Sequence, residues 1–357
     1  MKPPALTSPQ GLPEWSSVRK TLLIRLRSIG DTILMTPALG ALKAWRPDIE
    51  VTVLSEPLSA PLIEGHPLVD KLIVVERSLA SRARLISELR RKRFDVAFNM
   101  HGGTTATLIA KLSGARHSVG YAAYGLSRLL TARAPAPDLV LGRASIHSVE
   151  QQLALLHWAG VPWPDPVPRL TLQISPEAEA SIRRRLKEAG LDKEYAVLAP
   201  AAAFESKRWR AEGFAAAARH LGERWDMQCA VIAGPGQEDL AREVAALARP
   251  AARAVVGLDL KEVAALTALS RLFVGNDSGP MHIAAAMRRP VVALFGSSDP
   301  GVWHPWTGSP YRIAGRPPRS NACDIKDIPD EEVIAAIDEV MKEALGAVSA
   351  TDTVIKL

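Results

Sequence analysis

One segment near the amino terminus places a carboxylate where an apolar run meets a helix-forming stretch. In RLRSIGDTILMTPAL the apolar run ends at Leu26, a short loop containing glycine follows, and Asp31 precedes the next helical pattern. A carboxylate at the end of a strand can act as a general base on a substrate in the adjoining cleft. Asp is also among the best residues for capping a helix, so capping alone is the alternative interpretation.

A second segment, LFVGNDSGPMHIAAAMRRPVVALFG, reads as a strand, a polar turn, a helix and another strand. Ser278, Gly279 and Pro280 open the helix, whose free backbone amides and positive dipole end favour a phosphate or pyrophosphate. His282 lies one turn into the helix and could donate to the same group. The alternative is a polar turn without a ligand, since such turns are common.

Three further segments carry candidate groups after apolar runs. Lys207 follows the run YAVLA and could hold a phosphate, or could be an ordinary surface lysine. Glu238 follows GPGQ and could accept a hydrogen bond from a ribose hydroxyl, or could only stabilise the helix dipole. His101, in FNMHGGT, could face an acceptor or sit in a turn. Nucleophile-elbow and HExxH zinc patterns are both missing from the sequence.

Composition and charge narrow the class of protein. The 357 residues are 47% hydrophobic and 23% charged, with a net charge of +6, so the chain is globular and attracts anions. The densest basic run is Arg90 to Arg93. It is either a solvated helix end or a patch that contacts a phosphorylated or membrane-borne partner. No zinc-finger or RNA-binding signature is present, so nucleic acid is not an expected partner.

Apolar runs of strand length alternate with amphipathic segments of helix length, which predicts repeated βαβ units. The predicted strands are Thr21–Leu26, Glu50–Leu54, Lys71–Val75, Phe94–Asn99, Tyr195–Ala199, Gln228–Ala233, Ala254–Val256, Leu272–Val274 and Val291–Phe295. The predicted helices include 32–45, 58–65, 79–92, one from Pro176 to a stop at Gly190, and one over Pro329–Leu345.

Prolines at alternate positions in GVPWPDPVPRL forbid a helix there and mark a domain boundary. The fold class predicted is α/β, with two doubly wound domains facing each other across a cleft. The proline-rich first 19 residues show no signal peptide and no apolar run is long enough to span a membrane, which predicts a cytoplasmic protein. Cys229 and Cys323 suit a reducing compartment.

In the order of its segments the chain resembles glycosyltransferase family 9, the bacterial ADP-heptose:lipopolysaccharide heptosyltransferases. The resemblance extends from about Lys20 to Leu345. Its most specific parts are RLRSIGDTILMTPAL, Lys207-Arg208-Trp209, GNDSGPMHIAAA with PVVALFG, and WHPW at 303–306. Arg210, where many members have proline, and a short cysteine-containing region depart from the family pattern.

The resemblance implies a GT-B fold with two Rossmann-like domains. It implies an irregular segment over 1–19, an acceptor domain over 20–165 and a nucleotide-sugar domain over 166–328. A helix over 329–346 would return to the first domain, and 347–357 would form a tail.

The resemblance also implies an inverting transfer that needs neither a metal nor a cofactor. The reaction would move a heptosyl residue from a nucleotide sugar, ADP-L-glycero-D-manno-heptose, to the lipopolysaccharide inner core. Asp31 would be the catalytic base. The acceptor side would include Arg27 and His101. The donor side would comprise Lys207, Glu238, Asp277, Ser278, Gly279 and His282.

The expected partners are therefore the nucleotide sugar and an anionic, lipid-linked acceptor. The expected state is a monomer at the cytoplasmic face of the inner membrane, with peripheral membrane contact. A transferase with another donor or acceptor and a nucleotide-sugar epimerase remain alternatives. A dehydrogenase should show a full G-x-G-x-x-G fingerprint, which is missing here, and a sugar-binding protein of the exported kind should carry a signal peptide.

Overall fold

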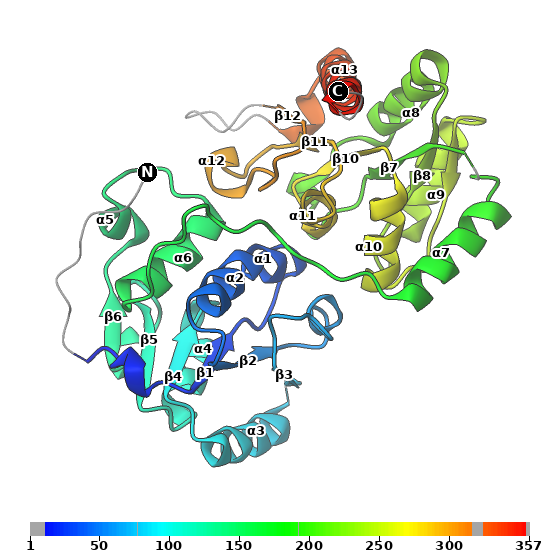
Figure 1. Ribbon diagram of the computed structural model, residues 1–357. Helices are drawn as coiled ribbons and strands as arrows, with labels where there is room; N and C mark the ends of the chain where they lie inside the picture. Colours follow the sequence, from blue (N-terminus) through cyan, green and yellow to red (C-terminus); the bar gives the residue numbers. More distant parts are fainter. Residues whose placement is uncertain (1–10, 77, 192, 316–323, 355–357) are drawn as a thin grey trace. The chain divides into compact units, whose positions relative to one another are not determined.

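The computed structural model describes residues 11–76, 78–191, 193–315 and 324–354. The chain divides into two compact units, Met1–Gln173 and Ile174–Leu357 (Figure 1). Residues 166–173 thus belong to the first unit, although the predicted second domain began at residue 166. Parts of the predicted amino-terminal segment and of the predicted tail lie outside the described ranges, namely residues 1–10 and 355–357. Cys323 also lies outside them. Among the helices within these ranges, none is both long and apolar enough to cross a bilayer.

The first unit is a doubly wound α/β unit built on a six-stranded sheet, all of whose paired strands run parallel. Its strands are β1 (Lys20–Ile24), β2 (Glu50–Ser55), β3 (Lys71–Val74), β4 (Val96–Asn99), β5 (His117–Tyr121) and β6 (Ala132–Ala134). Its helices are η1 (Trp15–Ser17), α1 (Ile29–Leu34), α2 (Thr36–Trp45), η2 (Ala60–Leu62), α3 (Leu79–Lys92), α4 (Gly103–Leu112), η3 (Ser127–Leu129), α5 (Pro137–Leu141) and α6 (Ser148–Trp158).

Helices cover both faces of this sheet. One face carries α3 and α4, whose buried residues share an apolar core with β1 and β4. Helices α1, α2 and α6 contact one another and lie on the other face (Figure 1). The predicted helix over 32–45 is divided into α1 and α2 because Pro37 stands in the first turn of α2 and lacks the amide that a continuous helix needs. Of the predicted helix over 58–65, only the short turn η2 forms.

The second unit repeats the architecture. Its strands, also parallel, are β7 (Tyr195–Ala199), β8 (Gln228–Val231), β9 (Ala252–Ala254), β10 (Leu272–Asn276), β11 (Val291–Leu294) and β12 (Tyr311–Ala314). Its helices are α7 (Pro176–Glu188), η4 (Glu205–Lys207), α8 (Ala211–Trp225), α9 (Glu238–Leu247), α10 (Leu260–Leu269), α11 (Gly279–Ala286), α12 (Pro300–Trp303), η5 (Ile325–Asp327) and α13 (Asp330–Val354). Helix α7 begins as predicted, with Ser175 accepting a hydrogen bond from the Ala178 amide.

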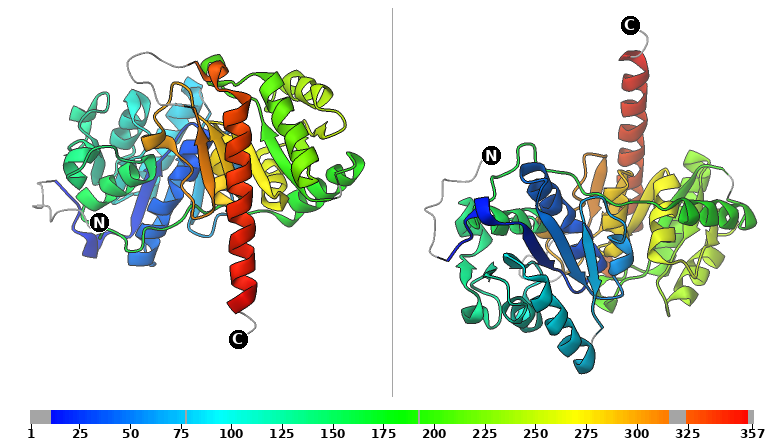
Figure 2. Two further views of the ribbon diagram at one scale, coloured as in Figure 1. Left: turned by 90° about the horizontal axis from the view of Figure 1, so that it is seen from above. Right: turned by 60° about the horizontal axis from the view of Figure 1, so that its bottom comes forward.

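The last helix belongs to the second unit. Helix α13 packs on β11, β12 and α8, and Val333, Ile337 and Val340 are buried in the apolar core of the second unit. Figure 2 shows α13 as one long helix that runs along this unit and extends past its sheet. These contacts lie within the second unit, and packing of the helix over 329–346 on the first domain stays a prediction. The apolar stripe indicated a buried face, but not which sheet would bury it.

Candidate active site

Both sheets have the strand order of a dinucleotide-binding fold. In the first unit the order is β3-β2-β1-β4-β5-β6, and in the second it is β12-β11-β10-β7-β8-β9. Each order reverses direction at one point, between β1 and β4 and between β7 and β10. Ligands of such sheets bind at the carboxyl ends of the strands that flank this point. Asp31 and His101 follow β1 and β4, and Lys207 and Asp277 follow β7 and β10.

In the structure Asp31 is not the residue that caps α1. Ser28 is the N-cap of α1, and its side chain accepts a hydrogen bond from the Asp31 amide at 3.5 Å. Ser28 has a φ of 75°, a conformation that residues other than glycine rarely adopt. Asp31 lies in the first turn, where a negative charge suits the helix dipole, and its carboxylate does not cap the helix.

A buried arginine holds this carboxylate. Arg25, the residue after β1, forms an ion pair with Asp31 Oδ1 through Nη2. Its other terminal nitrogen, Nη1, donates to the carbonyl of Met100, which follows β4. Arg25 is buried and Asp31 is half-buried, so the pair is shielded from bulk water on the arginine side. Arg25 was not among the predicted site residues, although a charged residue within the predicted strand Thr21–Leu26 was a signal for it.

The loop after β4 brings His101 into the same electrostatic environment. Asn99 Oδ1 accepts from the amides of His101 and Gly102, at 3.1 and 2.8 Å, and fixes the loop. Burial, followed by the nearby charges of Arg25 and Arg27, lowers the pKa of His101, while Asp31 raises it. His101 Nδ1 is buried and has no hydrogen-bond partner in the described part of the chain.

Tyr124 and Arg27 complete the surroundings of Asp31. Burial raises the pKa of Tyr124 to about 12, and Arg25 and Asp31 both contribute to its electrostatics. A Cβ at Gly102 would lie 3.2 Å from the ring of Tyr124, so this loop depends on glycine. Arg27 is exposed beside the loop that leads to Ser28. The first unit therefore brings the predicted acceptor-side residues together at one edge of its sheet.

In the second unit, an ion pair joins the two strands that flank the reversal of strand order. Lys207 Nζ lies 2.7 Å from Asp277 Oδ2, and Asp277 is almost fully buried. Asp277, which the resemblance placed on the donor side, therefore forms an ion pair with Lys207. Asn276, a residue that the sequence analysis did not assign, accepts from the Trp209 amide at 3.2 Å and donates to the Pro200 carbonyl at 2.8 Å. It ties the loop that carries Lys207 to β10.

The start of α11 presents unsatisfied polar groups. Ser278 is the N-cap but makes no capping hydrogen bond, and its Oγ is buried without a hydrogen-bond partner among the residues described. Backbone amides at a helix start have no partner within the helix, and Gly279 contributes one here. His282 lies in the same helix and is buried. An anion at this helix end would satisfy the free amides and the Ser278 hydroxyl.

Glu238 occupies the first position of α9, after the carboxyl end of β8, and is half-buried. The preceding Gln237 donates from Nε2 to the carbonyl of Ala202 at 3.0 Å, which connects this turn to the loop after β7. Glu238 thus lies at the same sheet edge as Lys207.

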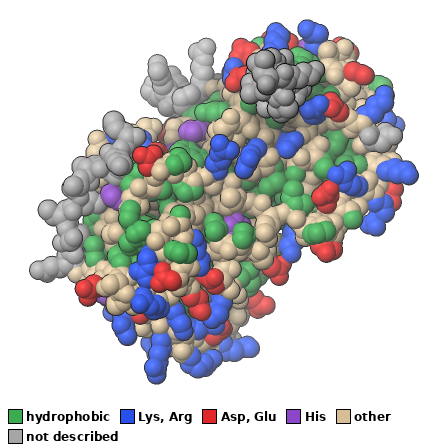
Figure 3. All heavy atoms as spheres, viewed as in Figure 1, with side chains coloured by type: hydrophobic (Ala, Val, Ile, Leu, Met, Phe, Trp, Pro, Cys, Tyr) green, Lys and Arg blue, Asp and Glu red, His purple; other side chains and the backbone are tan. Residues whose placement is uncertain are grey.

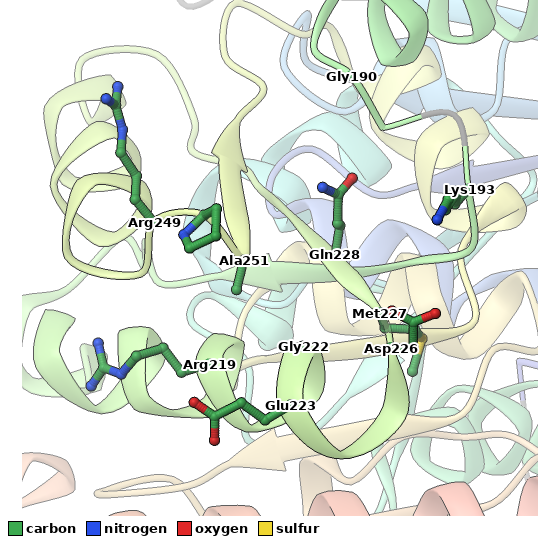
Figure 4. Close-up of a pocket in the computed structure, with 11 residues that line it drawn as sticks. Gly190, Lys193, Arg219, Gly222, Glu223, Asp226, Met227, Gln228, Arg249 and Ala251 are labelled. Atoms are coloured by element: carbon green, nitrogen blue, oxygen red, sulfur yellow. The ribbon is translucent and has the colours of Figure 1, made fainter.

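A cavity of about 430 Å³ lies elsewhere in the second unit (Figure 4). Its lining includes Gln228 at the start of β8, Ala251 just before β9, and Arg219 and Glu223 of α8. These positions belong to the amino ends of the strands, opposite the edge that carries Lys207. None of the predicted site residues lines this cavity.

Comparisons with known proteins agree with this arrangement. The sequence matches the model of glycosyltransferase family 9 (heptosyltransferase) over residues 82–326. Lipopolysaccharide heptosyltransferase 3 of Escherichia coli is 28% identical over 336 residues, which cover 88% of this chain and 97% of that protein.

Two solved structures share the fold. The glycosyl transferase family 9 structure from Veillonella parvula has a TM-score of 0.81 at 24% identity, covering 91% of this chain and 98% of that one. The E. coli ADP-heptose lps heptosyltransferase II has a TM-score of 0.76 at 24% identity, covering 90% and 98%.

Proposed function

The chain belongs to glycosyltransferase family 9, and we propose that it moves a heptosyl residue from a nucleotide sugar to the inner core of lipopolysaccharide. The donor that we propose is ADP-L-glycero-D-manno-heptose. The names of two similar proteins support the proposal. The E. coli protein described above is a lipopolysaccharide heptosyltransferase, and the second solved structure is an ADP-heptose lps heptosyltransferase. The observation that carries the proposal is the Asp31 carboxylate, held by Arg25 at the carboxyl edge of the first sheet.

In the proposed reaction Asp31 takes the proton from an acceptor hydroxyl. The hydroxyl oxygen attacks the anomeric carbon as the bond from that carbon to the phosphate oxygen breaks, which inverts the configuration. Arg25 would hold the carboxylate in position through the ion pair, and its hydrogen bond to the Met100 carbonyl keeps the guanidinium itself in place. General base catalysis of this kind contributes about 10²- to 10⁴-fold.

The donor diphosphate would bind at the carboxyl edge of the second sheet. Lys207, the amides at the start of α11 and the Ser278 hydroxyl would stabilise the negative charge that develops on the leaving nucleoside diphosphate. With these groups supplying the positive charge, the reaction would not need a divalent ion. Glu238 is the candidate for a ribose hydroxyl.

The acceptor in this proposal is anionic and attached to a lipid. We place the reaction at the cytoplasmic face of the inner membrane, with the protein in peripheral contact and acting as a monomer. The net charge of +6 favours an anionic acceptor and an anionic surface.

A panel of ADP-, GDP-, UDP- and dTDP-sugars tests the proposal. We expect the ADP-sugar alone to give transfer to a deacylated inner-core acceptor, with nuclear magnetic resonance showing an inverted anomeric centre. The matched control is the same incubation without acceptor. An epimerised nucleotide sugar without transfer would replace the proposal with an epimerase, and transfer from a different nucleotide would correct only the donor.

A further inference from the structure

Four leucines expose much of their side chains on one part of the first unit. Leu108 and Leu112 belong to α4, and Leu126 and Leu129 to the segment around η3. They are 38%, 42%, 49% and 40% exposed, respectively. We call these four residues the leucine surface. Single exposed leucines are ordinary, but a contiguous apolar patch on a protein surface indicates an interaction site.

Because α4 and η3 contact each other, the two segments that carry the four leucines lie side by side. Leu108 and Leu112 are four residues apart and share a helix face with Thr104. A Cβ at Gly125 would lie 2.8 Å from the Thr104 Cγ2 atom, so the chain that carries Leu126 runs against this helix. Helix α4 and Leu130, just after η3, bury their other sides in the same core on one face of the sheet, which turns the leucine surface outward.

Cationic side chains lie near the leucine surface, and the chain segment that carries the four leucines contains no acidic residue. Residues 96–137, which span β4 to the start of α5, contain no Asp or Glu, although the whole chain has 38 among 357 residues. Lys111 and Arg128 are exposed within this segment. On the neighbouring helix α3, Arg90 donates from Nε to the Leu112 carbonyl at 3.0 Å, which connects the basic run directly to the leucines.

The basic run extends this cationic margin over α3. Arg90 and Arg91 are exposed, and Lys and Arg side chains gather over this helix at the bottom of the view in Figure 3. Lys92 is paired with Glu88 at 3.3 Å, so the unneutralised charge comes mainly from the arginines. Exposed apolar groups bordered by Lys and Arg match the two layers of a bilayer surface, acyl chains and anionic headgroups.

We propose that the leucine surface and its cationic margin dock the protein on a bilayer that contains anionic phospholipid. The leucines would enter the headgroup boundary, while Lys111, Arg128, Arg90 and Arg91 would contact lipid phosphates. A nucleic acid would favour the cations but not the leucines. The inference rests on the proposed function in one respect: a lipid-linked acceptor gives a reason for membrane contact.

The position of the leucine surface relative to Asp31 fits such an acceptor. Helix α4 begins at Gly103, directly after the His101 loop, and Tyr124 contacts Gly102 two residues before Leu126. The surface thus starts at the sheet edge that carries Asp31 and Arg25. The sugar end of a lipid-linked acceptor could reach this edge while its acyl chains remain in the bilayer below the leucines.

Flotation of the full chain with vesicles tests the docking surface without donor or acceptor. The vesicles are phosphatidylcholine, with or without a quarter phosphatidylglycerol. The test variants are Leu108→Gln with Leu112→Gln, and Leu126→Ser with Leu129→Ser. Leu139→Gln and Leu247→Gln are matched controls because both leucines are exposed on other elements. Circular dichroism and thermal unfolding verify that each variant is folded.

We expect each leucine pair to weaken binding to anionic vesicles about tenfold or more, while the controls bind normally. Lys111→Gln with Arg128→Gln should weaken it about fivefold per charge, and Arg183→Gln with Arg184→Gln on α7 should not. Folded leucine variants that still bind normally would overturn the proposal. So would variants that lose only self-association, which would make the surface a contact between copies of the chain. Transfer to the deacylated acceptor is measured separately, so failure of the docking surface leaves the proposed function standing.

Discussion

At the scale of single residues, the proposed acceptor side depends on a carboxylate whose partner is a buried cation. Arg25 has only Asp31 and the Met100 carbonyl as hydrogen-bonding partners among the contacts described, and its Nε has none. Removing one member of a buried ion pair leaves the other charge without compensation, which costs more than the pair itself contributes. Arg25 and Asp31 are therefore coupled in stability as well as in the proposed chemistry.

Asp31→Asn separates chemistry from structure. The amide oxygen can still accept from Arg25, so we expect a loss of about 1 to 2 kcal/mol of stability, less than for Asp31→Ala. An amide cannot take a proton, so kcat should fall about 10²- to 10⁴-fold while ADP affinity stays nearly normal. The measurements are steady-state kinetics, ADP titration and thermal unfolding.

Asp48→Asn is the matched control for this change. Asp48 is an exposed carboxylate paired with Arg46 at 2.7 Å, away from the strand ends that carry the site. Its replacement should leave kcat unchanged. An Asp31→Asn enzyme with near-normal kcat on its true acceptor would show that another group is the base, and His101 would be the next candidate.

His101 predicts a pH dependence of stability in the first unit. Burial lowers the pKa of His101, and it also lowers the pKa of His66, which contacts Thr171 at 3.0 Å. Below about pH 6.5 the unfolded imidazole binds a proton that the folded one resists, so stability is present above this pH and is lost as the pH falls. Each histidine can contribute a slope of at most about 1.4 kcal/mol per pH unit.

We expect His101→Gln to flatten the acid side of the stability profile, measured by thermal unfolding between about pH 5 and 8. His117→Gln is the control, because the His117 side chain lies near the surface, where it contacts the Gly11 carbonyl. An unchanged acid slope in the His101 variant would mean that its imidazole titrates alike in the folded and unfolded chain.

At the scale of elements, the proposed donor side depends on how the loop after β7 is anchored. Trp209 is buried, donates from Nε1 to the Ile328 carbonyl at 2.9 Å, and stands two residues after Lys207. A Cβ at Gly213 in α8 would lie 2.4 Å from the Trp209 ring. Only a residue without a side chain leaves room for the indole at Gly213, and the anchored indole helps to position Lys207.

Gly213→Ala should destabilise the second unit although alanine is the better helix former. The overpacking penalty is about 1 to 3 kcal/mol, against a helix-propensity gain of about 1 kcal/mol. We expect a lower melting temperature and weaker ADP binding, because Trp209 must move and the Lys207 loop moves with it.

Gly222→Ala in the same helix is the matched control, since its Cβ would meet only the Ala251 side chain, at 3.2 Å, and more distant atoms. It should be nearly neutral for both stability and ADP binding. Equal effects of the two substitutions would show that the contact with Trp209 does not matter.

Most strands were predictable because each buries a short apolar run, and β7 forms over the predicted residues. Three strands escaped detection for physical reasons. β6 and β12 are short and contain arginine, and β5 contains His117, Ser118 and Gly120, so none has a strong apolar signal. These segments form strands because each pairs with a neighbouring parallel strand. That pairing cannot be read from a single sequence.

The position of a candidate residue was predictable where the residue follows a strand, as for Asp31, Lys207 and the turn at Ser278, and their part in the reaction stays a prediction. The site was not predictable where the role lies in supporting those residues. Asn99 and Asn276 fix loops through their side-chain amides, and Arg25 holds a carboxylate from the position directly after β1. Such contacts join segments far apart in the chain, which local patterns cannot reveal.

At the scale of the whole molecule, the two units have separate apolar cores and each carries part of the proposed site. We expect calorimetry to resolve two unfolding transitions. ADP in the presence of EDTA should raise only the transition of the second unit, by roughly 5 to 10 °C at a hundredfold excess over its Kd. A requirement for magnesium or manganese in this shift or in turnover would contradict the metal-independent donor site.

The Lys207–Asp277 ion pair has a consequence for the end of the catalytic cycle. In the proposed reaction the diphosphate would share the lysine with a carboxylate that is already 2.7 Å away, so this carboxylate would limit how tightly the enzyme retains its product. Asp277→Asn should remove this competition and make ADP a stronger product inhibitor. Turnover would then become limited by departure of the spent nucleotide, visible as a burst followed by a slower steady rate.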